Sequence, residues 1–140
     1  MLIDLDDGLI HEFVQESREL LEKCRLALSQ FADQGEAKCF EDFGLYIDRI
    51  MGASFTMGFN QIGELSKLGK QIGYKSSQIK DIDKLLTSQS LLSQLVKEIE
   101  QMLKAIHIKK VETINDVSKL LARLNKANEG LGDLRASVKI

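Results

Sequence analysis

The sequence contains no proline and only two cysteines. Because proline is the residue that most strongly interrupts a helix, its absence leaves long helices unbroken and favours an all-α protein. Cys24 and Cys39 stand fifteen residues apart, with no CxxC pair and no cluster of histidine or cysteine beside them. This spacing gives little support to a zinc site or any other metal site, and we expect both residues to be buried or half-buried free thiols.

The chain also lacks a dominant charge and a long apolar run. Lys and Arg total 19 against 21 Asp and Glu, a formal net charge of -2, so no field over the whole molecule favours nucleic acid or an anionic membrane. Residues 1–10 lack the basic start and continuous apolar stretch of a signal peptide, and no window approaches the ~18 apolar residues of a membrane span. We expect a cytoplasmic protein without a cofactor, a nucleic-acid partner or a membrane partner.

What the sequence does contain is apolar residues repeated every three or four positions. The 140 residues, 44% of them hydrophobic, suit a single domain over residues 1–140 with one core. The repeats predict helices at residues 7–33, 36–57, 60–73, 81–107 and 111–126. Short connections between amphipathic helices imply antiparallel neighbours, so the predicted fold is an antiparallel four-helix bundle core with a fifth helix.

Small and polar residues mark the ends of these segments. A carboxylate or amide side chain can accept the first free backbone N–H groups of a helix, and glycine can take the left-handed conformation that ends one. We expect caps at Asp6 or Asp7 and at Asn60, and helix ends at Gly35, Gly58 and Gly73. The polar segment 74–80 is then predicted to be a loop.

The second segment places Phe40, Phe43, Ile47 and Ile50 on one stripe, and beside it lies a second, unusual face. Gly44, Asp48 and Gly52 are spaced by four residues and therefore share that face. A glycine inside a helix costs about 0.5 to 1 kcal/mol relative to alanine, so two of them around one exposed acid suggest a partner that approaches the backbone closely. Packing of another helix into the glycine notch is the alternative, and spacing alone does not choose between them.

The segment that follows adds a motif. Residues 48–59, DRIMGASFTMGF, resemble the motif of histidine phosphotransfer domains: a histidine, two residues, Lys-Gly, two small residues and later Gly-Phe. The matching positions are Gly52, Ala53, Ser54, Met57, Gly58 and Phe59. Residues 9–22, LIHEFVQESRELLE, are similar to the first helix of such domains at the front of chemotaxis-type histidine kinases. With the five-helix order, the resemblance extends to about residue 125.

Two departures from this motif decide the expected chemistry. Asp48 stands at the histidine position and Met51 at the lysine position, so the residues that would carry and neutralise a phosphoryl group are absent. An acyl phosphate forms in receiver domains beside a metal ion, an acidic cluster and a lysine, and the sequence around Asp48 supplies none of these. His11 and His107 show no positioned partner and are expected to be ordinary surface or boundary residues. We expect no catalytic residue and no enzyme.

The resemblance implies that the docking surface remains. In the family, the glycine-flanked patch of the second helix and the adjoining face of the first receive a response-regulator receiver domain. The equivalent patch here would centre on Asp48, Arg49, Met51, Gly52 and Phe55, next to Gly44, with Gln15 or Glu19 and Lys67 at its rim. Met51 and Phe55 would supply apolar anchors, although Phe55 lies one step from the inner stripe and also suits the core.

We therefore predict a non-catalytic pseudo-histidine-phosphotransfer module of two-component or phosphorelay signalling that binds a receiver domain or a histidine kinase. One alternative is a generic helical interaction domain that dimerises through the glycine notch, which leaves monomer and homodimer both open. Another is a phosphatase of receiver acyl phosphates, in which an acid and an amide one turn apart aim a water. That spacing occurs at Glu112 with Asn115 and at Glu12 with Gln15, but such pairs are common in helices as solvated side chains or caps.

Overall fold

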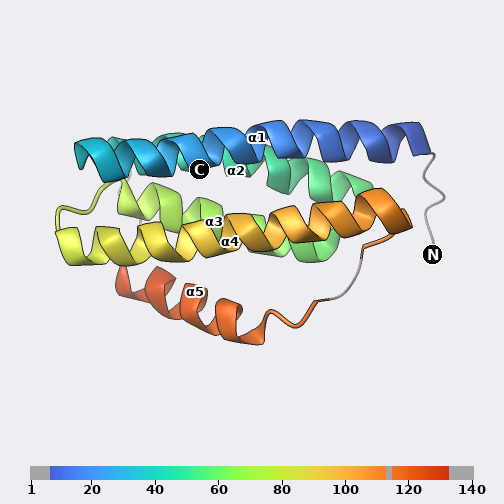
Figure 1. Cartoon of the computed structure of the whole chain (residues 1–140). Helices are drawn as coiled ribbons and strands as arrows, with labels where there is room; N and C mark the ends of the chain where they lie inside the picture. Colours follow the sequence, from blue (N-terminus) through green and yellow to red (C-terminus); the bar gives the residue numbers. More distant parts are fainter. Residues whose placement is uncertain (1–6, 113–114, 133–140) are drawn as a thin grey trace.

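The computed structural model describes residues 7–112 and 115–132, and these residues form five helices and no strand (Figure 1). The helices are α1 (Asp7–Gln34), α2 (Lys38–Met57), α3 (Asn60–Ser76), α4 (Ile82–Lys109) and α5 (Ser118–Gly130). The prediction of an all-α fold is confirmed. None of the described helices has an apolar stretch long enough to cross a membrane.

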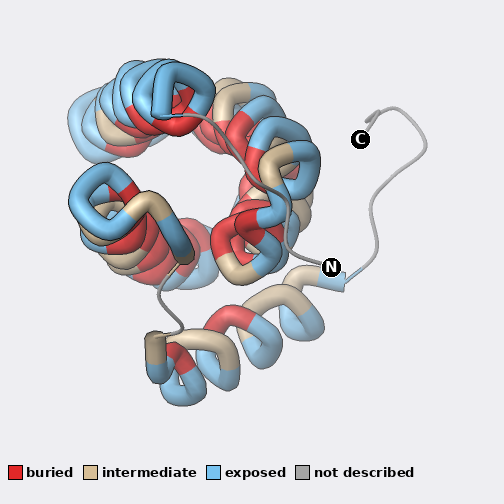
Figure 2. The backbone as a smooth tube through the Cα atoms, turned by 90° about the vertical axis from the view of Figure 1, so that its right-hand side faces the viewer, coloured by how far each residue is buried: buried red, intermediate tan, exposed pale blue. Residues whose placement is uncertain are grey.

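The first four helices form an antiparallel ring, and α5 lies outside it. Close backbone contacts join α1 to α2, α2 to α3, α3 to α4 and α4 to α1, whereas the diagonal pairs α1 with α3 and α2 with α4 have no Cα atoms within 8 Å of each other. Looking down the bundle, Figure 2 shows the buried side of each of the four helices turned toward the shared centre. Helix α5 packs from outside against α3 and α4. This is the predicted four-helix core with a fifth helix.

The core follows the apolar stripes read from the sequence. The α2 stripe residues Phe40, Phe43, Ile47 and Ile50 are all 0% exposed. The Phe40 ring meets the Phe31 ring of α1 with 4.7 Å between centroids, a tilted arrangement that aromatic pairs favour. Each such side chain stabilises the fold by about 1.5–3 kcal/mol relative to leaving it exposed.

Glycines allow α2 and α3 to approach closely. A Cβ added at Gly73 would lie 3.0 Å from the backbone oxygen of Phe40. Gly73 is therefore inside α3 because α2 passes there, and the prediction that it ends the helix is wrong. The helix continues through Ser76, so part of the predicted loop at 74–80 is helical. By contrast, Gly35 (φ 68°) and Gly58 (φ 82°) follow α1 and α2 in the left-handed conformation, as predicted.

The cap of α3 comes from far along the chain. Asn60 is the first helical residue and not the predicted cap, and the preceding residue Phe59 has no side-chain acceptor. Instead, the Glu112 carboxylate accepts hydrogen bonds from the backbone N–H groups of Gln61 (3.2 Å) and Ile62 (3.0 Å). A carboxylate at a helix N-terminus satisfies free donors and is favoured by the helix dipole.

This cap also explains why the fifth helix begins later than predicted. The expected start at residue 111 is wrong, because α5 begins at Ser118 and ends at Gly130. Among the described residues before it, Glu112 and Asn115 are non-helical and contact α3, and the Asn115 backbone N–H donates to Gln61 Oε1 at 3.1 Å. Residues 113 and 114, which fall in the predicted helix, lie outside the described residues.

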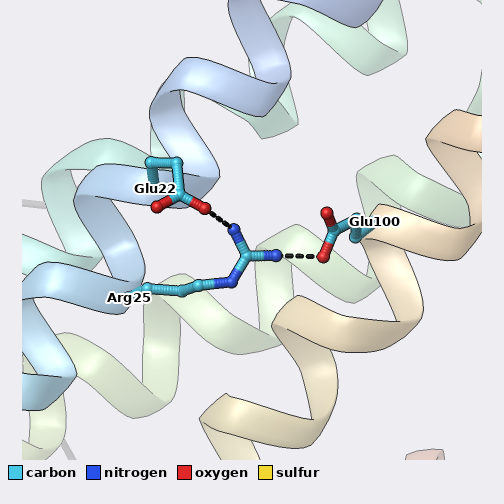
Figure 3. Close-up of polar contacts among 3 residues, drawn as sticks. All are labelled: Glu22, Arg25 and Glu100. Carbon is cyan, nitrogen blue, oxygen red and sulfur yellow. Dashed lines mark hydrogen bonds and ion pairs between the residues drawn. The ribbon is translucent and has the colours of Figure 1, made fainter.

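A charged network joins α1 to α4, on the side of the ring opposite the α2–α3 contact. The Arg25 guanidinium of α1 forms ion pairs with Glu22 one turn earlier and with Glu100 of α4 (Figure 3). Both Arg25 and Glu100 are about one third exposed, so water and salt weaken this interaction. The network links the two long helices at this point but adds little to the stability of the bundle.

Candidate functional site at Asp48

Asp48 lies at the outer edge of the α2–α3 contact and is paired with a lysine. Its Oδ1 is 2.9 Å from the Nζ of Lys70, which comes from α3. The Lys70 side chain is only 13% exposed and the Asp48 side chain 41% exposed. The aliphatic stem of Lys70 is therefore largely covered while its ammonium group reaches the carboxylate, an arrangement typical of long cationic side chains. The predicted exposed acid is thus half-buried and neutralised by a cation that its position in the sequence did not reveal.

Tyr74, one turn after Lys70, completes this part of the surface. Burial raises the pKa of the Tyr74 hydroxyl, and the negative charges of Asp48 and Glu41 raise it further. The Tyr74 ring also covers Gly44, because a Cβ added there would lie 3.1 Å from the ring. Gly44 is buried, so its predicted place on a bare face is wrong. The Tyr74 ring of the same chain fills the Gly44 end of the glycine notch. A second copy of the chain therefore has no room to pack there.

Gly52 differs from Gly44 because no neighbouring side chain covers it. It is exposed, and no atom that would hinder a side chain lies within 4 Å of where its Cβ would be. Next to it on α2, Arg49 is exposed and Met51 is half-buried. Phe55 is 37% exposed, and one side of its ring lies so close to Gly63 of α3 that a Cβ there would be 2.6 Å away. Phe55 is thus held by α3 while part of its ring faces solvent.

The Asp48–Lys70 ion pair and the contact of Phe55 with Gly63 join the exposed residues of α2 to those of α3. Lys67 is exposed one turn before Lys70, so it adds a second cation on α3. We call this region the Asp48 surface, and it consists of Asp48, Arg49, Met51, Gly52, Phe55, Lys67 and Lys70.

Gln15 and Glu19, the predicted rim residues of α1, lie elsewhere. Both line a hollow of about 300 Å³ between α1 and α4, together with Arg18 and the two histidines. Because α1 and α4 meet on the opposite side of the ring from α2 and α3, this hollow faces away from the Asp48 surface. The structure therefore does not bring Gln15 or Glu19 to the rim of that surface.

The two histidines are neighbours, which sequence reasoning missed. The rings of His11 and His107 lie 5.9 Å apart between centroids at an angle of 45°. The antiparallel pairing of the first and fourth helices is the signal that could have indicated this contact, since it brings the start of one beside the end of the other. Among the described residues, no group of three or more His, Cys, Asp or Glu side chains is placed to hold a metal ion.

One of the two acid–amide pairs proposed for a phosphatase is engaged in structural contacts. The Glu112 carboxylate caps α3, and the Asn115 side-chain amide donates to Glu98 Oε1 at 3.2 Å. Neither group is free to aim a water. Glu12 and Gln15 are both exposed on α1.

No protein-family profile, curated protein or solved structure matches this chain. The resemblance to histidine phosphotransfer domains therefore stays a prediction from residues 9–22 and 48–59.

Proposed function

We propose that this chain is a non-catalytic pseudo-phosphotransfer module of two-component or phosphorelay signalling. It binds a response-regulator receiver domain, or a histidine kinase, through the Asp48 surface and carries no phosphate. The helical bundle is compatible with such a module, and the motif over residues 48–59 points to this class of partner.

The observation that carries the proposal is the openness of Gly52. A glycine in the middle of a helix costs about 0.5 to 1 kcal/mol, so it needs a compensating role. Gly44, Gly63, Gly69 and Gly73 have one, because an added Cβ at each would meet atoms of a neighbouring helix within 3.3 Å. Gly52 has no such neighbour. A close approach by another molecule, with Arg49 and Phe55 beside it, accounts for this glycine.

The pairing of Asp48 with Lys70 bears on both parts of the proposal. A receiver domain presents an acidic phosphorylation pocket, which an isolated carboxylate would repel. Lys70, 2.9 Å from Asp48, offsets that negative charge, and the exposed Arg49 and Lys67 add positive charge nearby. Of the three features that accompany acyl phosphate formation in receiver domains, Lys70 supplies the lysine, but among the described residues no acidic cluster is placed to hold a metal ion beside Asp48. This arrangement supports binding through the Asp48 surface without phosphate transfer.

Calorimetric titration against purified receiver domains from the same genome tests the binding surface. Gly52→Gln is the most informative variant, because it places a side chain at a position where an added Cβ meets no other atom within 4 Å. We expect it to weaken binding at least tenfold, while Ala32→Gln at an exposed position of α1 leaves affinity unchanged. Equal affinities for the two variants, or binding to none of the receivers, would contradict the proposal.

Phosphate transfer is tested separately with a radiolabelled phosphorylated receiver. The natural chain is expected to acquire no acid-labile label. The double variant Asp48→His with Met51→Lys restores both motif positions and is expected to acquire label from a receiver that binds. Failure of this variant with every such receiver would oppose a retained phosphotransfer surface, and labelling of the natural chain at Asp48 would oppose the non-catalytic assignment.

A further inference from the structure

A groove runs between α4 and α5, away from the Asp48 surface. It comprises two adjoining hollows of about 620 and 230 Å³. Both are lined by Thr87 of α4 and Ala127 of α5, so the two hollows meet at these residues. Figure 2 shows α5 as a separate tube beside the four-helix ring.

Most of the exposed area inside the groove is apolar, although serine, threonine and charged residues also line it. Leu86, Leu91 and Ala127 line the larger hollow, and Leu131 lines the smaller one. Leu86 is 50% exposed, and Ile82 one turn before it is 53% exposed. Of the α5 side chains, only Leu124 is buried, and the other apolar residues of this helix are partly exposed. Covering this surface would be favourable by about 25 cal/mol per Å² of apolar area.

Cationic residues border the apolar groove. Lys84, Arg123 and Lys126 line it, against a single acid, Asp83, although the whole chain has a formal net charge of -2. Lys84 donates to the backbone oxygen of Gly130 at 3.3 Å, and Arg123 donates to Gln94 Oε1 at 2.9 Å. None of these three cations forms an ion pair with an acid among the described residues. Their positive charge is therefore available to a partner.

We propose that this groove binds an acidic amphipathic helix of a partner protein. Two antiparallel helices form a natural seat for a third, whose apolar residues at positions i, i+3, i+4 and i+7 enter the groove. Acidic residues on the flanks of that helix would meet Lys84, Arg123 and Lys126, and this complementarity selects acidic helices over basic ones. The length of α5, 13 residues or about 20 Å, accommodates a partner helix of three to four turns.

The shape of the groove favours a helix over an anionic bilayer. Leu91 lines the hollow but is only 4% exposed, so a ligand must project inward to reach it. A ridge of helix side chains projects in this way, whereas a flat lipid surface would contact only the outer residues such as Leu86.

The test uses a labelled synthetic peptide of about 14 residues, with leucine at i, i+3, i+4 and i+7 and glutamate on the flanks. Fluorescence anisotropy is expected to show saturable binding that Lys126→Glu weakens at least fivefold. Lys104→Glu makes the same charge change at an exposed site of α4 outside the groove and is expected to leave the affinity unchanged. Leu86→Gln should also weaken binding. Its control is Leu26→Gln, which makes the same change at an exposed position of α1 and should leave the affinity unchanged.

Three results would overturn this proposal. One is equal binding of a peptide in which lysine replaces every glutamate. Another is an equal loss of affinity in Lys126→Glu and Lys104→Glu. The third is capture of the chain by phosphatidylglycerol vesicles, sensitive to Lys126→Glu, with no peptide binding. Circular dichroism confirms that each variant is folded. Gly52→Gln separates this site from the Asp48 surface, since it should leave peptide binding intact.

Discussion

The contact between α2 and α3 and the attachment of α5 are built in opposite ways. Between α2 and α3, glycines bring the helix backbones together, and a Cβ at Gly73 would lie 3.0 Å from a backbone oxygen of α2. Helix α5 instead has one buried side chain, Leu124, with partly buried apolar residues around it and polar contacts such as Lys75 Nζ to the backbone oxygen of Asn128 at 3.3 Å. We expect the first contact to permit little movement and the second to loosen more easily.

This difference suits the two surfaces to different partners. The Asp48 surface spans α2 and α3 and is therefore presented in a fixed shape, as docking of a folded domain requires. One wall of the groove is α5, which has a single buried side chain, so we expect this wall to adjust to a helix more readily. Four changes test the contrast, and the expected effects decrease in the order given.

Gly73→Val should have the largest effect, because it forces a branched side chain into the α2 backbone. We expect a loss of about 3 kcal/mol or more in the free energy of unfolding. Urea denaturation followed by circular dichroism measures it. A loss below about 1 kcal/mol would show that α2 and α3 can separate easily, and would contradict the claim that their contact is rigid.

Leu124→Ala should cost about 2–3 kcal/mol, but mainly in α5. The expected outcome is faster amide hydrogen exchange over residues 118–130 with little change in the cores of α1 to α4. Mass spectrometry of peptides from the exchanged protein resolves the two regions. Equally faster exchange throughout the chain would mean that α5 is an integral part of the bundle.

Alkaline pH should weaken the four-helix bundle by about 1 kcal/mol between pH 8 and 10. Burial raises the pKa of the Cys24 thiol to about 12, above its usual value of 9.0, so the unfolded chain loses this proton first. The stabilisation present below pH 9 is then lost progressively as pH rises toward 12. The raised pKa of Tyr74 adds a further loss above about pH 10. Urea titrations of the natural chain and Cys24→Ala should differ in their pH dependence, and identical slopes would contradict this expectation.

Gly52→Ala should have the smallest effect and the opposite sign. Alanine fits the helix with no atom to displace, so we expect stabilisation by about 0.5–1 kcal/mol. Gly44→Ala is the matched change, and it should destabilise because its Cβ would press on the Tyr74 ring at 3.1 Å. Thermal melts of both variants compare the two positions. Stabilisation by both would contradict the distinction between an open glycine and a packed one.

The sequence predicted those features that depend on neighbouring residues. The apolar stripes, the helix ends at Gly35 and Gly58 and the order of helices follow from local periodicity and backbone preference. The predicted helix end at Gly73 was wrong because a glycine that allows close packing of a neighbouring helix cannot be told from a helix-ending glycine by sequence alone. The cap from Glu112 was missed because it comes from fifty residues away.

In the candidate site, too, features set by neighbouring residues were predicted and features set by another helix were not. Spacing placed Asp48 and Gly52 on one face, but the burial of Gly44 depends on Tyr74 of the next helix. The cation at Asp48 comes from Lys70, and no local pattern links these two positions. Gln15 and Glu19 were assigned to the rim from resemblance alone, and their orientation depends on which side of α1 meets α4.

The most direct test of the Asp48 surface is a two-dimensional ¹⁵N–¹H NMR titration of the chain with a receiver domain that binds it. The account predicts that the largest shift changes occur at Asp48, Arg49, Gly52 and Phe55 and at Lys67 and Lys70 of α3. Shifts confined to the α4–α5 groove or to the hollow around His11 and His107, with α2 unchanged, would contradict it.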